Sequence, residues 1–204
     1  MSKNSAAMTE ESIVSNLWES SRVLRELSQE APAIGRAAQA ITACLRKKGK
    51  VVSFGNGGSA ADAQHLAAEL SGRFEKDRPG LPAVALTTNS STLTAIANDY
   101  GYSHVFLRQV QGFVKRGDVV VAISTSGNSG SVLEAVKQAK KQGGVTIGWT
   151  GSNGGKLQKN VDICLKVPST RTSRIQEGHL ALLHTICGLV EDALFPGAKK
   201  AGGY

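Results

Sequence analysis

Two kinds of hydrophobic pattern alternate along this chain. Five short apolar runs, rich in β-branched residues and bounded by turn residues, are typical of buried strands. These runs cover residues 50–54, 83–87, 119–123, 145–149 and 162–167. Segments with helical spacing of apolar residues follow them, at about 59–72, 91–97, 103–114, 130–142 and 173–194. The alternation predicts an α/β fold: a doubly wound, five-stranded parallel sheet in three layers, with helices on both faces.

Two further helices are predicted before the first strand. Thr9 can cap a helix that reaches about residue 29, with Glu10 and Glu11 in its first turn. Pro32 suits the first turn of a second helix, which ends near residue 49. We expect these helices, within residues 1–49, to cover the sheet or to pack on another subunit. Together with an α/β core at 50–196 they would form a single domain over residues 1–204.

A glycine-rich turn links the first strand to its helix. Residues 55–59 read GNGGS, and such a turn can present backbone N–H groups to an anion at a helix N-terminus. The helix then carries His65 and Glu69, whose i, i+4 spacing places them on one face. Two plainer interpretations stay open: the glycines serve only the turn, or the pair is an ordinary surface pair. Apolar neighbours predict a largely buried helix, in which polar side chains are paired or functional.

A second polar turn follows the third strand. It reads STSGNS and offers the hydroxyl groups of Ser124, Thr125, Ser126 and Ser129. Hydroxyls and the N–H groups of a helix N-terminus bind phosphate without a Lys or Arg. The alternative is a helix cap with a hydrophilic turn. Both turns follow strands of one parallel sheet, so we expect them to meet at its carboxyl edge and form one site.

Composition and charge narrow the classes of partner. Of the 204 residues, 41% are hydrophobic and 20% charged, as in a globular protein, and the net charge is +8. A basic surface attracts phosphorylated substrates, but no Lys/Arg stripe with interleaved aromatics is present, so nucleic-acid binding is not expected. The N-terminus has no hydrophobic signal region and no apolar run has membrane-spanning length, which predicts a cytoplasmic protein. Three isolated cysteines are expected to be reduced core residues: Cys44, Cys164 and Cys187.

Four motifs together resemble one known family. They are GNGGSAADAQH at 55–65, NDYGY at 98–102, STSGNS at 124–129 and RIQEGH at 174–179. They are similar to motifs of the sugar isomerase (SIS) domain, specifically of the phosphoheptose isomerases, and the resemblance runs over nearly the whole chain. It implies conversion of sedoheptulose 7-phosphate to D-glycero-D-manno-heptose 7-phosphate, the first step of bacterial heptose synthesis for lipopolysaccharide. It also implies a homotetramer with active sites at subunit interfaces.

The resemblance assigns roles to individual residues. An aldose–ketose isomerase moves a proton between adjacent carbons through an enediol, which needs a base and an acid. Glu69 would be the base and His184 the acid. Zinc would be held by His65, Glu69, Gln176 and His184, and since a zinc-bound carboxylate is a poorer base, the two roles of Glu69 compete. The residues expected to contact the sugar or its phosphate are Asn56, Gly57, Gly58, Ser59, Arg73, Asn98, Asp99, Ser124, Thr125, Ser126, Ser129 and Gln176.

Two other classes of protein compete with the isomerase. A branch of the same fold associates with the DnaA initiator as a scaffold, and this chain shares its LTAIAND at 93–99 and its LFP at 194–196. That branch lacks counterparts of Glu69 and His184, so the isomerase is favoured. Ser173 stands where some isomerases have Asp. A nucleotide-binding protein is disfavoured, because the glycine turn lacks a GxGxxG pattern and no acidic residue follows the second strand.

The spacing of Gln176 and His184 raises a question about the site. Eight residues of helix separate two positions by about 12 Å along the axis. If both side chains reach one metal ion, either the helix begins after Gln176 or a neighbouring subunit supplies part of the site. We therefore expect an active site that is shared between subunits.

Overall fold

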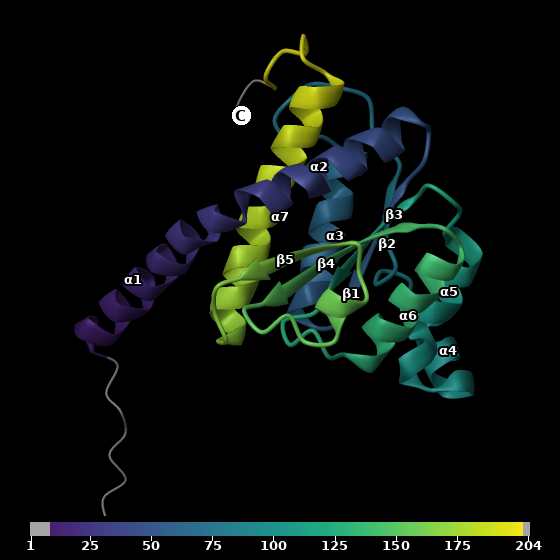
Figure 1. Ribbon diagram of the computed structural model, residues 1–204, viewed down its shortest axis with the longest axis horizontal. Helices are drawn as coiled ribbons and strands as arrows, with labels where there is room; N and C mark the ends of the chain where they lie inside the picture. The colour runs from purple at the N-terminus through teal and green to yellow at the C-terminus, as the bar shows by residue number, and fades with distance from the viewer. Residues whose placement is uncertain (1–8, 202–204) are drawn as a thin grey trace, which may run out of the picture.

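A five-stranded parallel sheet forms the centre of the protein (Figure 1). The computed structural model describes residues 9–201, so residues 1–8 and 202–204 of the expected single domain lie outside the described part. The spatial order of the strands is β2-β1-β3-β4-β5, which confirms the predicted doubly wound fold. The strands are β1 (Val51–Gly55), β2 (Ala83–Ala85), β3 (Val119–Ile123), β4 (Val145–Gly151) and β5 (Ile163–Val167).

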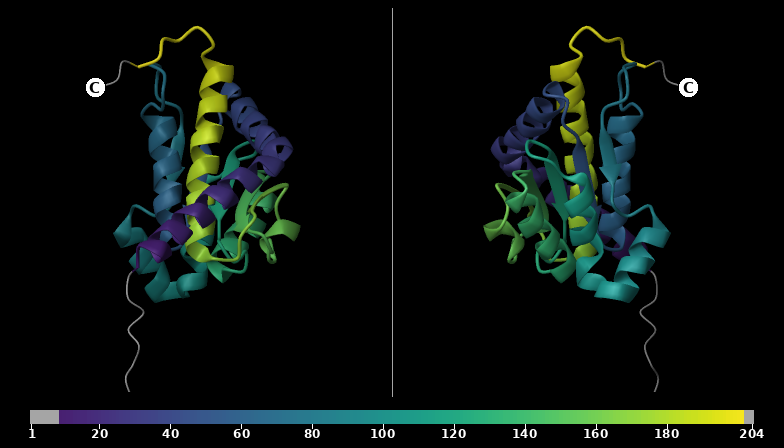
Figure 2. Two further views of the ribbon diagram at one scale, coloured as in Figure 1. Left: turned by 90° about the vertical axis from the view of Figure 1, so that its left-hand side faces the viewer. Right: turned by 90° about the vertical axis from the view of Figure 1, so that its right-hand side faces the viewer.

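Helices cover both faces of the sheet, and each face has its own hydrophobic core (Figure 2). Because side chains alternate along a strand, Val119, Val121 and Ile123 point to one face and Val120 and Ala122 to the other. The first face packs against α2, α3 and α7, and the second against α5 and α6, with α4 beside them. The bounds are α2 (Ala31–Arg46), α3 (Gly58–Ser71), α4 (Ser90–Tyr100), α5 (Val105–Phe113), α6 (Gly130–Lys141) and α7 (Thr172–Leu194), with a 3₁₀ turn η3 (Leu157–Lys159) before β5.

Two helices precede the sheet, as predicted. The side chain of Thr9 accepts a hydrogen bond from the backbone N–H of Ser12 and caps α1 (Glu10–Glu26), and Pro32 lies in the first turn of α2. The N-terminal part of α1 extends away from the body of the domain (Figure 1), while Val23 near its other end is buried. None of the helices between residues 9 and 201 is long and apolar enough to cross a membrane.

Some predicted boundaries differ from the observed ones. The helix predicted over 9–29 ends in a 3₁₀ turn, η1 (Leu27–Glu30), and the helix predicted over 103–114 begins in one, η2 (Tyr102–His104). The helix predicted to end near residue 97 continues to the end of α4, because the terminating residue is Gly101, whose φ of 82° favours glycine.

The helix α3 is only half buried, which corrects the expectation of a largely buried helix. Leu66 and Leu70 lie in the core, whereas Ala61 and Ala68 are exposed. An alanine carries little apolar surface, so its exposure to water costs little free energy. The side of α3 that lies between the buried and the exposed residues packs against α7, with which α3 makes extensive contact.

The position of a ligand site follows from the order of the strands. Successive connections leave β1 and β3 toward opposite edges of the sheet, and these two strands are neighbours in it. Gly55 pairs with Ile123, so the chain leaves both strands at the same level. A doubly wound sheet binds its ligands at such a switch point, outside the carboxyl ends of the strands. The two polar turns therefore share one edge, as predicted.

Candidate active site

The glycine turn brings the N-termini of α3 and α7 together. Gly57 has a φ of 57°, which favours glycine. A Cβ on Gly58 would lie 2.1 Å from Nε2 of Gln176, so a larger residue at this position would displace the end of the Gln176 side chain. Gln176 therefore reaches the turn from its own chain, and the buried Ser59 follows it in the first turn of α3. The turn thus serves close packing, and its binding of an anion stays a prediction.

The second turn presents a pair of hydroxyl groups. The Oγ of Ser124 donates to the Oγ of Ser129 over 3.2 Å, and Ser129 makes no capping hydrogen bond although it directly precedes α6. The plain helix-cap interpretation of Ser129 is therefore not supported. Ser126 behaves differently, because its Oγ accepts from the backbone N–H of Asn128 and so stabilises the turn itself. Gly127, with a φ of 65°, turns the chain between them.

Hydrogen bonds connect the glycine turn to α6 and to Tyr102. The Nδ2 of Asn56 donates to the Oγ of Ser131 over 3.1 Å, and the hydroxyl of Tyr102 donates to the Oδ1 of Asn56 over 2.8 Å. Sequence reasoning did not assign a site role to Tyr102 or to Ser131. Tyr102 closes the NDYGY motif, which was the available signal, whereas Ser131 lies in α6 beyond the STSGNS motif and carried none.

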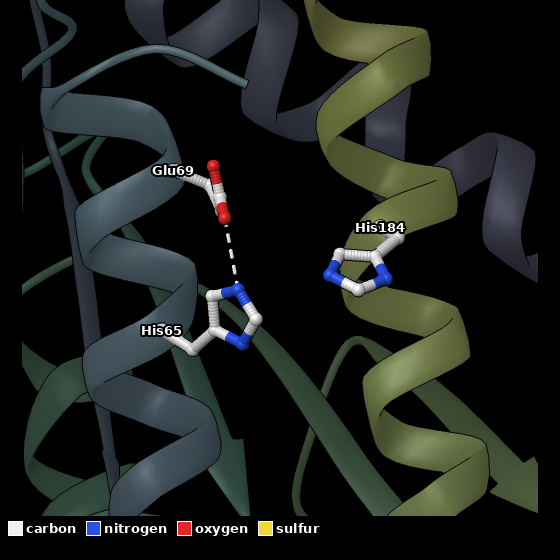
Figure 3. A group of neighbouring side chains, drawn as sticks. All are labelled: His65, Glu69 and His184. Carbon is white, nitrogen blue, oxygen red and sulfur yellow. Dashed lines mark hydrogen bonds and ion pairs between the residues drawn. The ribbon is translucent and has the colours of Figure 1, made fainter. Parts of the chain in front are cut away.

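Three side chains that can bind a metal converge between α3 and α7 (Figure 3). The Nε2 of His65 lies 2.8 Å from the Oε1 of Glu69, within α3. His184 faces them from α7, and its ring lies edge-on to the ring of His65 with 5.2 Å between centroids. One ligand atom of each residue lies within 4.8 Å of the others. The predicted pair on α3 is thus part of a cluster and not an isolated surface pair.

The cluster suits a small divalent metal ion. Two imidazoles and one carboxylate form a donor set that is common for zinc and leaves a coordination position open. All three donors come from one chain, so this cluster needs no residue of a neighbouring subunit, and the expectation of a site shared between subunits stays a prediction. The helix α7 begins at Thr172, so the alternative in which it begins after Gln176 is wrong. Since Gln176 packs on the glycine turn, its assignment as a fourth ligand stays a prediction.

Two neighbours define the environment of the cluster. The ring of Phe74 stacks on the ring of His184, with centroids 5.5 Å apart and planes 20° apart. Cys187 is buried one turn further along α7. Burial, and then the negative charges of Glu69 and Glu191, raise the pKa of the Cys187 thiol to about 12. The thiol therefore stays protonated near neutral pH and is not a competing base.

Three predicted sugar contacts lie outside this arrangement. Asn98 and Asp99 are exposed in the last turn of α4, where they bond to each other over 2.9 Å. Arg73 is exposed just after α3. Within residues 9–201 none of the three has a hydrogen bond to a predicted site residue outside this group of three, so their roles stay predictions. Thr125 is half-buried in the second turn.

A second polar pair lies between α3 and α7, on the side of the cluster that is nearer the glycine turn. The Nδ1 of His179 and the Oδ2 of Asp62 are buried 3.9 Å apart, and neither atom has a hydrogen-bond partner within residues 9–201. Burial lowers the pKa of His179 to about 4, so the imidazole is neutral, and its Nε2 can donate to the carbonyl of Thr150 at 3.3 Å. The unprotonated Nδ1 of His179 and the Oδ2 of Asp62 are then two hydrogen-bond acceptors that face each other. Burial, against the opposing charge of His65, raises the pKa of Asp62 to about 6.

This pair predicts a pH-dependent gain in stability for Asp62→Asn. Above pH 6 the folded protein holds a desolvated carboxylate that the unfolded chain keeps in water, which lowers the free energy of unfolding. The cost fades as the pH falls through 6 toward 4, because the folded carboxyl takes up its proton. A shift of two pKa units corresponds to about 3 kcal/mol, so we expect the variant to gain on the order of 1–3 kcal/mol at pH 8 and little at pH 4.

Denaturant unfolding across this pH range measures the effect. Asp77→Asn is the matched control, because it removes the same charge from an exposed loop position. A stability difference that does not change with pH, or a less stable Asp62→Asn protein at pH 8, would contradict the assignment.

Comparison with known proteins agrees with this geometry. The SIS domain family model matches residues 17–151. A phosphoheptose isomerase of Rhodospirillum rubrum is 59% identical over 164 residues, which cover 80% of this chain and 87% of that protein. The solved phosphoheptose isomerase GmhA of Neisseria gonorrhoeae is 45% identical with a TM-score of 0.85, over 90% of this chain and 98% of that one. A solved phosphoheptose isomerase of Francisella tularensis is 39% identical with a TM-score of 0.87, over 91% and 100% of the two chains. The chain therefore belongs to the SIS domain family and, within it, to the phosphoheptose isomerases.

Proposed function

We propose that this protein is an aldose–ketose isomerase that converts sedoheptulose 7-phosphate to D-glycero-D-manno-heptose 7-phosphate, the first step of bacterial heptose synthesis. The observation that carries the proposal is the separation of two chemically different groups along α3. The glycine turn, which we propose holds the phosphate, lies at its N-terminus, and the cluster of Glu69 and His65 with His184 of α7 begins two turns further on. The sugar would lie along the helix, with its phosphate at one end and its reacting carbons at the other.

The separation fits the length of a seven-carbon sugar. His65, whose Nε2 lies 2.8 Å from the carboxylate of Glu69, is seven residues after Gly58, which is about 10 Å of helix. An extended chain from C2 of a heptulose to the phosphorus atom of its 7-phosphate spans about 9 Å, from ordinary bond lengths. A five-carbon ketose 5-phosphate is shorter by about 2.5 Å on the same basis, so it cannot fill both ends at once.

Glu69 and His184 can divide the two proton transfers between them. The Glu69 carboxylate would take a proton from C1 of the ketose and return it to C2, so that the enediol collapses to the aldose. His184 would move the proton between the oxygens on C1 and C2 from α7, opposite Glu69 on α3. The hydrogen bond from His65 would orient the carboxylate of Glu69.

The phosphate would be held by the two turns. Ser124 and Ser129 offer adjacent hydroxyls, and Thr125 and Ser126 lie in the same turn. The N-termini of α3 and α6 point their free N–H groups toward the same edge of the sheet. Asn56 and Gln176 would contact the sugar hydroxyls from the glycine turn.

A zinc ion is the proposed cofactor. His65, Glu69 and His184 would hold it, with Gln176 as the proposed fourth ligand. When bound, zinc would polarise the sugar carbonyl and stabilise negative charge on its oxygen. The residues of this chain would still hold and move the protons.

The same convergence of Glu69 and His184 argues against the scaffold alternative. A protein that only associates with an initiator needs no base, acid and phosphate cradle at one edge of its sheet. We also propose a cytoplasmic location, because Cys44, Cys164 and Cys187 are all free thiols, as a reducing compartment maintains.

The direct test is turnover of sugar phosphates of different length. We expect aldose formation from sedoheptulose 7-phosphate, and kcat/KM lower by on the order of 100-fold for ribulose 5-phosphate, because the shorter sugar cannot place its C1 at Glu69 while its phosphate stays bound. Glu69→Gln keeps the shape of the side chain and removes the base, so it should lose kcat while the thermal unfolding midpoint stays close to that of the wild type. Absence of an aldose product from the heptulose phosphate, or equal kcat/KM for both sugars, would overturn the proposal.

We further propose that residues 1–49 pack copies of this single-domain chain into a homotetramer. Ile13, Leu17 and Trp18 are exposed on one side of α1, with Leu17 and Trp18 both 67% exposed. Leu189 of α7 is also exposed, beside an apolar groove that α2 and α7 form. A second copy of the chain fits this surface, because α1 extends from the domain and presents the same apolar side chains that the groove would cover.

Trp18→Glu should break this assembly. A charge at the centre of an apolar contact costs far more than it does in water. We expect the wild-type protein to sediment near four times the 21.3 kDa of one chain and the variant to sediment as smaller species. Gln111→Glu adds the same charge at an exposed position of α5, on the other face of the sheet, and serves as the control. A wild-type protein that sediments as a monomer would contradict the proposal, and so would a Trp18→Glu protein with unchanged mass.

A further inference from the structure

The loop that follows α3 reaches the active site without regular structure of its own. It runs over residues 72–80 and carries Phe74, whose ring stacks on the imidazole of His184. A loop of this kind positions a ring only if its backbone is held. The contacts that hold it lie at the far end of α7, around one buried carboxylate.

Glu191 is that carboxylate, and it is 1% exposed. Its oxygens accept hydrogen bonds from three successive backbone N–H groups, those of Phe74, Glu75 and Lys76, at 3.0, 2.9 and 3.0 Å. The Nε of Arg78 donates to it over 2.8 Å. Burial by itself raises the pKa of Glu191, but these donors outweigh burial and lower it. The carboxylate is therefore ionised and fixes the backbone at the base of Phe74.

Arg78 connects the same carboxylate to the end of α3. Its Nη2 donates to the carbonyl of Glu69 over 2.7 Å, and its Nη1 to the carbonyls of Leu70 and Gly72 over 2.7 and 2.9 Å. Carbonyls in the last turn of a helix lack partners within the helix, so a guanidinium group is well suited to them. Arg78 thus holds the turn of α3 that carries the proposed base.

The ion pair between Arg78 and Glu191 therefore contacts the supports of both proposed catalytic groups. On one side it holds the backbone of Glu69, and on the other it holds the backbone of Phe74, whose ring fixes the plane of His184. Buried ion pairs add little net stability compared with apolar side chains of similar size, so stability alone does not account for this one. The fixed directions of its hydrogen bonds account for the ion pair, because they define the positions of the Glu69 and Phe74 backbones.

We infer that the buried Arg78–Glu191 ion pair is a positioning element that sets how the catalytic groups of α3 and α7 face each other. The inference rests on the proposed function, since it concerns the same site. Arg78, Glu191 and Phe74 act through Glu69 and His184 and not on the sugar. Their loss should therefore reduce kcat more than it changes KM, because the phosphate turns lie at the other end of α3.

Glu191→Gln tests the ion pair. Gln keeps the shape of the side chain, but it is uncharged and presents an amide donor to groups that are all donors. A misplacement of about 1 Å at a catalytic group costs up to about 100-fold, so we expect kcat to fall on the order of 10- to 100-fold, with KM for sedoheptulose 7-phosphate changed by less than about threefold. Asp192→Asn is the matched control. Asp192 is the next residue of α7 and also holds the loop, through Lys76 at 2.7 Å, but its side chain is 71% exposed.

Phe74 provides the second pair of variants, which keeps the test open if Glu191→Gln does not fold. Phe74→Leu retains an apolar side chain but removes the ring, whereas Phe74→Tyr retains the ring. NMR of histidine ring signals in the metal-free protein reports the stack without any turnover. His184→Gln identifies the signals of His184. We expect these signals to shift in Phe74→Leu and in Glu191→Gln, and to stay near their wild-type positions in Phe74→Tyr and Asp192→Asn.

The two readouts separate the outcomes. Loss of kcat with a shifted His184 signal in folded Glu191→Gln supports the inference, and so does loss of kcat in folded Phe74→Leu with kcat retained in Phe74→Tyr. Unchanged His184 signals in both variants overturn it, and so does a fall in kcat in Asp192→Asn that equals the fall in Glu191→Gln. If the wild-type protein does not isomerise the heptulose phosphate, the proposed function fails, and the NMR shifts alone still decide whether the ion pair positions His184.

Discussion

The parallel packing of α3 against α7 is the contact on which the active site depends. It begins where Gly58 lies against the side chain of Gln176, and it continues where the ring of His65 meets the ring of His184. It ends where Glu191 holds the loop that follows α3. Two helices from distant parts of the sequence are thereby fixed in register at both ends, and the groups that would transfer protons face each other between these ends (Figure 3).

The fold and the two turns were predictable because their signals are local. Short β-branched runs indicate the strands, and the adjacency of β1 and β3 follows from the topology of doubly wound sheets. The cluster of His65, Glu69 and His184 was harder to predict. The spacing of His65 and Glu69 places them on one face of a helix, but only the family resemblance connected them with His184, whose apolar neighbours in the sequence are typical of a core histidine. Tyr102, Phe74 and the distant ion pair stayed unassigned, because their roles depend on contacts between segments far apart in the sequence.

The polar groups between α3 and α7 differ in how well they are paired. The ion pair at the far end is fully supplied with hydrogen bonds, whereas Asp62 and His179 face each other with buried atoms that lack partners within the described residues. Satisfied groups make a rigid frame, and unsatisfied ones raise the free energy of the fold. The ion pair, which forms the rigid frame, therefore lies beside the proposed catalytic groups. The unpaired polar atoms of Asp62 and His179 lie between these groups and the glycine turn. This arrangement is expected where function and stability compete.

The central claim is that each active site takes its base and its acid from one chain. Complementation between two inactive variants tests it directly. Glu69→Gln chains and His184→Ala chains are co-expressed with different tags, and oligomers that carry both tags are purified and assayed with sedoheptulose 7-phosphate. Oligomers of wild-type chains with chains that carry both substitutions are the control, and they should keep activity in proportion to their wild-type chains. We predict no activity above that of the single variants, because every site retains one defect. Recovery of activity in the mixed oligomers would contradict the claim, since Glu69 and His184 would then come from different subunits.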